Sequence, residues 1–341
     1  MASMHNSKSA LHARTRQSSY DLTHNTSRFN RAACRAATGR LLSNRAAAGG
    51  PSSGGNSPAD DEPPKLPSGN ALEATIRRKQ RELEAAIREL GMEALDERLR
   101  SAAQLPARPP YRLASLIAEE VPQGRPVLLF EVARPDPTTS SAQLAQLAAA
   151  YVSRGGAGAL AVRTDSAATP AGLRDLFSVT QALPRVPVLA RDWLLHPLQV
   201  CEFKEAGAAG AIGIVNQVSG RGTGLLSSFS AALGLDAPVE VVNTREVEQL
   251  AQQGVVFYAA NVGVGLTLAA PGLAAQVAEG LLRELPAGAI SMVGVRSVQG
   301  AAAARRAGAD CLLVKAELLH SYGEDVAALG ADLQYAVSLD D

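Results

Sequence analysis

Two glutamates lie inside apolar runs that are typical of β-strands. Glu131 belongs to VLLFEV, and Glu240 belongs to PVEVV. Burying a carboxylate without a partner is costly, so each of these side chains needs a cation or a reacting ligand beside it. Two interpretations stay open on the residues alone. The glutamates do acid–base or binding chemistry, or they form a structural ion network with Arg191 or Lys315.

Other polar side chains follow similar apolar runs along the chain. They are Arg134, Thr164, Asp165, Arg191, Asp192, Asn216, Asn261, Arg296 and Lys315. Several of these are cations, so an anionic ligand would suit the place where they meet. Whether they meet depends on the elements that carry them.

Eight short apolar runs alternate with helix-like segments of about 10–14 residues, a spacing that indicates βα units. The runs are VLLFEV (127), ALAVR (159), VPVLA (186), AIGIV (211), PVEVV (238), VVFYAA (255), AISMVGV (289) and CLLV (311). They are continuously apolar, as strands buried on both faces must be. An open doubly wound sheet would usually carry a glycine-rich loop after its first strand, and EVARPDP is no such loop. The sequence therefore predicts an α/β fold, a (β/α)8 TIM barrel, in which the strand-end residues share one mouth.

The segments before the barrel differ sharply in composition. Residues 1–59 hold eight of the 33 basic residues and one of the 33 acidic residues, and they are rich in Ser and Ala. Such a segment without an apolar core is typical of an organelle transit peptide, and the alternative is a disordered basic tail. Residues 60–69 are a predicted linker, and 70–126 a helical extension that begins with a helix from Asn70 to Gly91. The barrel takes up 127–341.

Charge and hydropathy exclude several classes of partner. Without residues 1–59 the chain keeps 25 basic and 32 acidic residues, a net charge of −7. This argues against a nucleic acid or an anionic membrane as a partner. No apolar run approaches the roughly 18 residues of a membrane span. Cys201 and Cys311 are expected to be buried thiols, because the cysteines lack disulfide or zinc spacing, and we expect no metal or cofactor.

From residue 70 to the C-terminus the chain resembles the indole-3-glycerol phosphate synthase family. Several segments carry the resemblance in the same order: NALEATIRRKQRELEAA, LFEVARPDP, GGAGALAVRTD, VPVLARDWLLHPLQVCEFKEAGAAGAIGIV, PVEVVNTREVEQLAQQG and GADCLLVKAELL. The family, a group of carbon–carbon lyases in tryptophan biosynthesis, closes an indole ring on 1-(2-carboxyphenylamino)-1-deoxyribulose 5-phosphate and releases carbon dioxide and water. The resemblance implies a lysine as general acid, a glutamate that assists dehydration, an asparagine that orients hydroxyls, and backbone amides that hold the phosphate.

On this resemblance the catalytic positions are Glu131, Arg191, Glu240 and Asn261. Three of these match the family, but Arg191 stands where the family has its catalytic lysine. Arginine keeps its proton far above neutral pH and is a poor general acid. Ala133 stands at a second lysine, which would bind the substrate carboxylate.

The phosphate-binding turns are also changed. The candidates there are Arg134, Arg296, Ser297 and Lys315. Arg134 lies next to Ala133 but is expected to point elsewhere on a pleated strand. Arg296 and Lys315 place bulk and positive charge where small residues are expected, so a phosphorylated small molecule would be bound through side chains.

Three functions therefore stay open. In the first, the chain is a family member that has lost the reaction and acts as a binding, regulatory or assembly protein. It would then have a protein partner in an organelle, which is the chloroplast or alternatively the mitochondrion. In the second, the chain is an active synthase that uses Arg191 in place of the lysine. In the third, it is a barrel enzyme that acts on another phosphorylated small molecule. Fold alone does not choose among them.

Overall fold

The computed structural model describes residues 70–338 with the exception of 105, 108, 168, 261–270 and 324. The predicted transit peptide and linker, residues 1–69, lie outside this range, and so does Asn261. All further structural statements concern the described residues.

Each of the eight predicted apolar runs contains a strand or strands, and all neighbouring strands pair in parallel. The strands are β1 (Val127–Val132), β2 (Ala159–Arg163), β3 (Val188–Arg191), β4 (Gly210–Ile212), β5 (Ile214–Val215), β6 (Val239–Val241), β7 (Phe257–Ala260), β8 (Ile290–Val295) and β9 (Cys311–Val314). Their order in the sheet is β4-β3-β2-β1-β9-β8-β7-β6-β5. The two edge strands, β4 and β5, are halves of the single run AIGIV, so the sheet curls back on itself. This confirms the predicted TIM barrel.

Gly213 separates β4 from β5 and forms the seam of the barrel. Its φ is +129°, and a Cβ at this position would lie 1.6 Å from the backbone oxygen of Asp192. Beside the seam, the N–H of Ala211 donates to the Asp236 oxygen at 2.8 Å, and the N–H of Asp236 donates to the Ala209 oxygen at 3.0 Å. These bonds join β4 to the segment that leads into β6. Only glycine fits where the strand changes partners.

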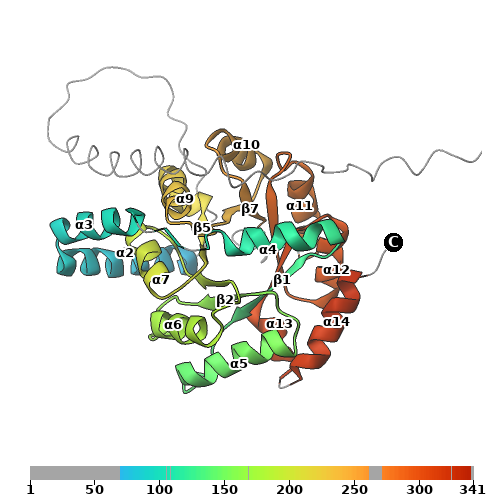
Figure 1. Cartoon of the computed structure of the whole chain (residues 1–341). Helices are drawn as coiled ribbons and strands as arrows, with labels where there is room; N and C mark the ends of the chain where they lie inside the picture. Colours follow the sequence, from blue (N-terminus) through green and yellow to red (C-terminus); the bar gives the residue numbers. More distant parts are fainter. Residues whose placement is uncertain are drawn as a thin grey trace, which may run out of the picture.

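Helices surround the strands, as Figure 1 shows. They are α2 (Asn70–Leu90), α3 (Met92–Gln104), α4 (Arg112–Glu120), α5 (Ser141–Ser153), α6 (Gly172–Ala182), α7 (Pro197–Glu205), α8 (Asn216–Ser219), α9 (Thr223–Ala232), α10 (Thr244–Gln252), α11 (Pro271–Arg283), α12 (Val298–Arg306), α13 (Ala316–Ser321) and α14 (Val326–Ser338), with short 3₁₀ turns η1 (Val121–Gln123) and η2 (Gly220–Gly222). The predicted first helix is confirmed as α2, and Gly91 follows it with a φ of +81°. In the described part of the chain, no helix has both the length and the apolar character to cross a membrane.

Alternation along the strands separates two packed layers. Leu129, Ala161 and Leu189 belong to the cluster inside the barrel, whereas Phe130 and Leu160 belong to the layer between strands and helices. Side chains two residues apart point to the same side of a strand. The next inward positions toward the carboxyl ends of the strands therefore carry Glu131, Arg163 and Arg191. Cys201 and Cys311 are both fully buried, which confirms the prediction of buried thiols.

Helix α4 closes the amino end of the barrel. Leu113 and Ile117 are buried in the inner cluster with the first residues of several strands, among them Val127 and Cys311. The Asp236 carboxylate accepts the N–H groups of Leu113 at 2.8 Å and Ala114 at 3.3 Å. These bonds satisfy donors at the start of the helix, since Tyr111 before it provides no side-chain cap. Access to the interior is thus restricted at this end.

Candidate functional site

Glu131 is the centre of a polar cluster at the carboxyl ends of the strands. Its side chain is fully buried, and its Oε1 accepts hydrogen bonds from Nη2 and Nε of Arg163 at 2.7 and 3.1 Å. Nε of Arg191 lies 3.3 Å from the same oxygen, and Nζ of Lys315 lies 4.0 Å from Oε2. Burial alone would raise the pKa of Glu131, but Arg191, Lys315 and Arg163 together hold it below its ordinary value. Glu131 is therefore an ionised carboxylate held by three cations.

Lys315 is a buried amine in the same cluster. Burial and the nearby Arg191 lower the pKa of Lys315 to about 8, despite the opposing effect of Glu131 and Glu240. Its stem crosses Gly294 on β8, where an added Cβ would lie 3.1 Å from the Lys315 Cε. The Lys315 side chain therefore extends from the last βα turn over the neighbouring strand β8, and it supplies side-chain bulk at the turn where the sequence predicted it.

Two of the three other residues predicted at the phosphate-binding turns, Arg296 and Ser297, lie at the surface. Arg296 is exposed, although its charge contributes to lowering the pKa of Lys315. The Ser297 hydroxyl accepts the N–H of Gly300 at 3.0 Å and caps α12. Ser297 thus has a local structural role.

Arg163 and Arg191 form a pair on neighbouring strands. They are register partners on β2 and β3, and both guanidinium groups approach Oε1 of Glu131. Nη1 of Arg191 is buried and has no hydrogen-bond partner within the described residues. We call these two residues the arginine pair.

A cavity of about 240 Å³ lies beside the arginine pair. It is lined by Arg163, Asp165, Arg191, Asp192, Trp193, Gly213, Val215 and Glu240. Glu240, predicted as catalytic, is buried on β6 in register with Val215. The structure thus brings Arg191 and Glu240 to one cavity and places Glu131 against the arginine pair.

Two aspartates on the cavity wall are paired with the first helix of the extension. Asp165 accepts a hydrogen bond from Nη2 of Arg78 at 2.6 Å, and Nζ of Lys79 lies 2.7 Å from Oδ1 of Asp192. The Lys79 and Asp192 side chains are 8% and 6% exposed. Burial raises the pKa of Asp192, although the charge of Lys79 opposes this. We call these two ion pairs the α2 tether, because they attach α2 to the barrel mouth.

Arg134 does not join the Glu131 cluster. Its Nε and Nη2 donate to the two carboxylate oxygens of Asp175 at 2.8 Å each, and the Asp175 side chain is fully buried. Thr169 also donates to this carboxylate at 3.1 Å. This arrangement agrees with the prediction that the Arg134 side chain points in a different direction from that of its neighbour, Ala133.

The sequence interpretation missed Arg163, Arg78 and Lys79. Arg163 ends the run ALAVR, and the alternation of inward residues along that run places it beside Arg191. This signal was available in the sequence. The tether had no comparable signal, because Lys79 and Asp192 are 113 residues apart.

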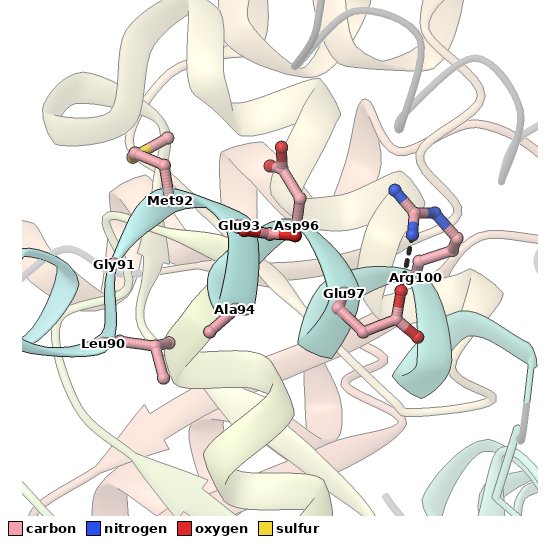
Figure 2. Close-up of a pocket in the computed structure, with 8 residues that line it drawn as sticks. All are labelled: Leu90, Gly91, Met92, Glu93, Ala94, Asp96, Glu97 and Arg100. Carbon is pink, nitrogen blue, oxygen red and sulfur yellow. Dashed lines mark hydrogen bonds and ion pairs between the residues drawn. The ribbon is translucent and has the colours of Figure 1, made fainter.

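A larger hollow lies on the extension and is shown in Figure 2. Its lining comes from α2, α3 and the Gly91 turn between them: Leu90, Gly91, Met92, Glu93, Ala94, Asp96, Glu97 and Arg100. Within it, Arg100 donates to Glu97 at 2.5 Å. It contains none of the strand-end residues, so we place the functional site at the barrel mouth.

Comparison with known proteins identifies the family. The family model described as indole-3-glycerol phosphate synthase matches residues 72–329. The chain is 32% identical over 154 residues to the indole-3-glycerol phosphate synthase of Opitutus terrae, an alignment that covers 43% of this chain and 58% of that protein. It is 32% identical over 201 residues to the protein of the same name from Mycolicibacterium gilvum, with 57% of this chain and 72% of that protein covered.

The family match covers almost the whole described barrel together with the helical extension. The matched range, residues 72–329, spans all nine strands of the parallel sheet, from β1 to β9. The chain therefore belongs to the indole-3-glycerol phosphate synthase family of tryptophan biosynthesis.

Proposed function

We propose that this chain has lost the ring-closing reaction of its family and binds a small anion at the barrel mouth as a binding, regulatory or assembly protein. The observation that carries the proposal is the state of Glu131, whose carboxylate is occupied by Arg163, Arg191 and Lys315. A carboxylate held by three cations is a weak proton acceptor. Arg191, at the position of the family's acid, holds its proton too tightly to donate it.

The position of the second family lysine supports the same proposal. Ala133 is buried beside the end of β1 and offers no charge to a substrate carboxylate. Loss of a general acid costs about 10²–10⁴-fold in rate. Loss of a positioning group adds to this, because a misplaced substrate reacts slowly.

The test is turnover by the full chain. The purified protein is incubated with 1-(2-carboxyphenylamino)-1-deoxyribulose 5-phosphate, and indole-3-glycerol phosphate is followed by its fluorescence. We expect no product above the enzyme-free control. Efficient turnover by the unmodified chain would contradict the proposal and support the active-synthase alternative that uses Arg191.

Restoring the family residues gives a sharper version of this test. We expect A133K together with R191K to remain inactive while Lys315 fills the last turn. Adding K315G opens that turn and is expected to produce measurable activity. If the double variant alone is active, Lys315 does not block the phosphate position.

A second candidate function, a barrel enzyme for another phosphorylated small molecule, is favoured by Lys315. An amine with a pKa of about 8 exchanges its proton near neutral pH, as a general acid or base must. A thermal-shift screen of sugar phosphates would test it. A hit that is lost in K315M supports this candidate, and a silent screen argues against it.

We further propose an organelle location and a protein partner. The support for the location is the basic, Ser-rich composition of residues 1–59. Residues 1–69 fused to a fluorescent protein should enter the chloroplast, with mitochondrial import as the alternative and cytosolic retention as the contrary result. A stoichiometric complex in organelle extracts would support the partner, whereas a lone monomer would not.

A further inference from the structure

The arginine pair has donors left over after it has bound Glu131. An arginine side chain carries five N–H donors in a planar fork. Arg191 places Nε on Glu131, while its buried Nη1 has no acceptor among the described residues. An unsatisfied buried donor is destabilising, so a ligand oxygen that accepts a hydrogen bond from Nη1 would stabilise the folded state. The Arg191 side chain is 26% exposed and lines the cavity, so its guanidinium group is accessible to a ligand there.

The charges around the cavity match a single negative charge. The inward side chains of the cluster are three cations, Arg163, Arg191 and Lys315, and two carboxylates, Glu131 and Glu240. Among these five side chains one positive charge is in excess, and two exposed side chains beside them, Glu317 (3.7 Å from Nη2 of Arg163) and Arg296, carry opposite charges that offset each other. The two remaining acids on the cavity wall, Asp165 and Asp192, pair with Arg78 and Lys79 of the α2 tether, which also contact Glu82, so this side of the cavity adds no positive charge. A carboxylate supplies one negative charge, whereas a phosphate ester near pH 7 carries almost two.

The size and lining of the cavity restrict further which ligands can bind. Its volume of about 240 Å³ is below the roughly 300–1,000 Å³ of sites for drug-sized ligands. Trp193 and Val215 supply the apolar part of the cavity wall. The cavity therefore suits a small molecule with an apolar body and one anionic end.

We propose that Arg163 and Arg191 form a binding subsite for the carboxylate of a small monocarboxylic acid. The proposal deepens the proposed function, since it rests on the mouth binding an anion. Both guanidinium groups now approach the same oxygen, Oε1 of Glu131, and their remaining N–H donors are available to the carboxylate of a ligand. Glu131 is then an internal competitor that shares the donors with the ligand.

The experiment is isothermal titration of the full chain at pH 7 with three ligands of similar size. Benzoate carries one negative charge, benzamide is its neutral counterpart, and phenyl phosphate carries nearly two charges. We expect benzoate to bind, benzamide to show no heat, and phenyl phosphate to bind more weakly than benzoate. Equal binding of benzoate and benzamide, or tighter binding of phenyl phosphate, would overturn the assignment, and so would no binding of benzoate.

Three variants locate the binding. R163M should weaken benzoate binding about tenfold or more, since hydrogen bonds to charged groups are among the strong ones. R174M removes the same charge from an exposed position on α6 and should leave binding unchanged. E131Q removes the internal competitor and should tighten binding several-fold, which keeps the proposal testable if R163M does not fold. Equal affinities of R163M and R174M, or weaker binding in E131Q, would contradict the subsite.

The outcomes separate this inference from the proposed function. Turnover of the family substrate together with Arg163-dependent benzoate binding would refute the proposed function and keep the subsite. No turnover and no benzoate binding would refute the subsite alone.

Discussion

At the scale of single residues, the environment of Lys315 decides how the barrel mouth responds to pH. The amine is 8% exposed and lies among two arginines and two glutamates. Its pKa of about 8 in the folded chain is well below the 10.5 of a free lysine. The folded state therefore gives up this proton at a lower pH than the unfolded state.

This shift predicts how stability depends on pH. Between about pH 8 and 10.5 the unfolded chain binds more protons at Lys315, so this residue makes the free energy of unfolding rise with pH in that window. Below pH 8 both states are protonated and the contribution is constant and unfavourable. We expect K315M to be more stable than wild type at pH 7 by about 1–3 kcal/mol. We also expect its free energy of unfolding to lack the increase between about pH 8 and 10.5. Urea unfolding at pH 7, 8, 9 and 10 measures both.

K315R provides the control, because arginine remains charged across this range. The free energy of unfolding of K315R should therefore not increase between pH 8 and 10.5, and K315R should be no more stable than wild type at pH 7. A K315M profile that matches wild type between pH 8 and 10 would show that Lys315 does not carry a depressed pKa.

Much of the candidate site at this scale was predictable from the sequence. Placing polar residues at strand ends identified Glu131, Arg191, Glu240 and Lys315, because the barrel brings all strand ends together. Roles were harder to predict, as Arg134 and Ser297 show. Each of them is satisfied by a nearby group, Asp175 or the Gly300 N–H, and such local pairing is not visible in the spacing of residues.

At the scale of elements, the α2 tether decides how the extension is attached. Lys79 and Asp192 form a buried ion pair between α2 and the end of β3. Removing one partner of a buried pair leaves a charge uncompensated, which costs about 3–5 kcal/mol. The attachment of α2 is therefore expected to depend on both residues.

We expect K79M to lower the free energy of unfolding by about 3 kcal/mol. In the double variant with D192N the uncompensated charge is gone, and the amide oxygen still accepts the Trp193 N–H that Asp192 accepts at 2.7 Å. The double variant should therefore recover much of the loss. R77M, on the exposed side of the same helix, should change stability little, because its pair with Glu73 is exposed. A double variant as unstable as K79M would contradict this account.

At the scale of the whole molecule, the barrel depends on the seam at Gly213. The close approach to the Asp192 oxygen leaves no space for a side chain, and the φ of +129° disfavours any residue but glycine. We expect G213A to cost more than about 3 kcal/mol or to prevent folding, as judged by circular dichroism and urea unfolding.

Gly254 is the matched control, since it has a φ of +81° but no atom within 4 Å of an added Cβ. G254A should cost about 1–2 kcal/mol, the strain of the backbone alone. Equal losses in the two variants would show that the contact at the seam is unimportant.

The fold class at this scale was predictable, and the seam was not. Eight apolar runs with helix-like segments between them match the eight βα units of a barrel, and the first run lacks the glycine-rich loop of an open doubly wound sheet. The run AIGIV nevertheless divides into β4 and β5. Gly213 inside the run is compatible with a break in the strand, but the group that approaches it, the backbone oxygen of Asp192, is brought there by the fold and is not visible in the run.

The placement of α4 has a consequence for how solutes come and go. Because this helix fills the amino end of the barrel, exchange with bulk water is left to the opposite rim, where Lys79 and Asp192 hold α2. We therefore expect the residence time of a bound molecule to depend on how firmly Lys79 and Asp192 hold the helix. Sequence changes on α2, outside the lining of the cavity, would then alter the dissociation rate without altering the contacts that select the ligand.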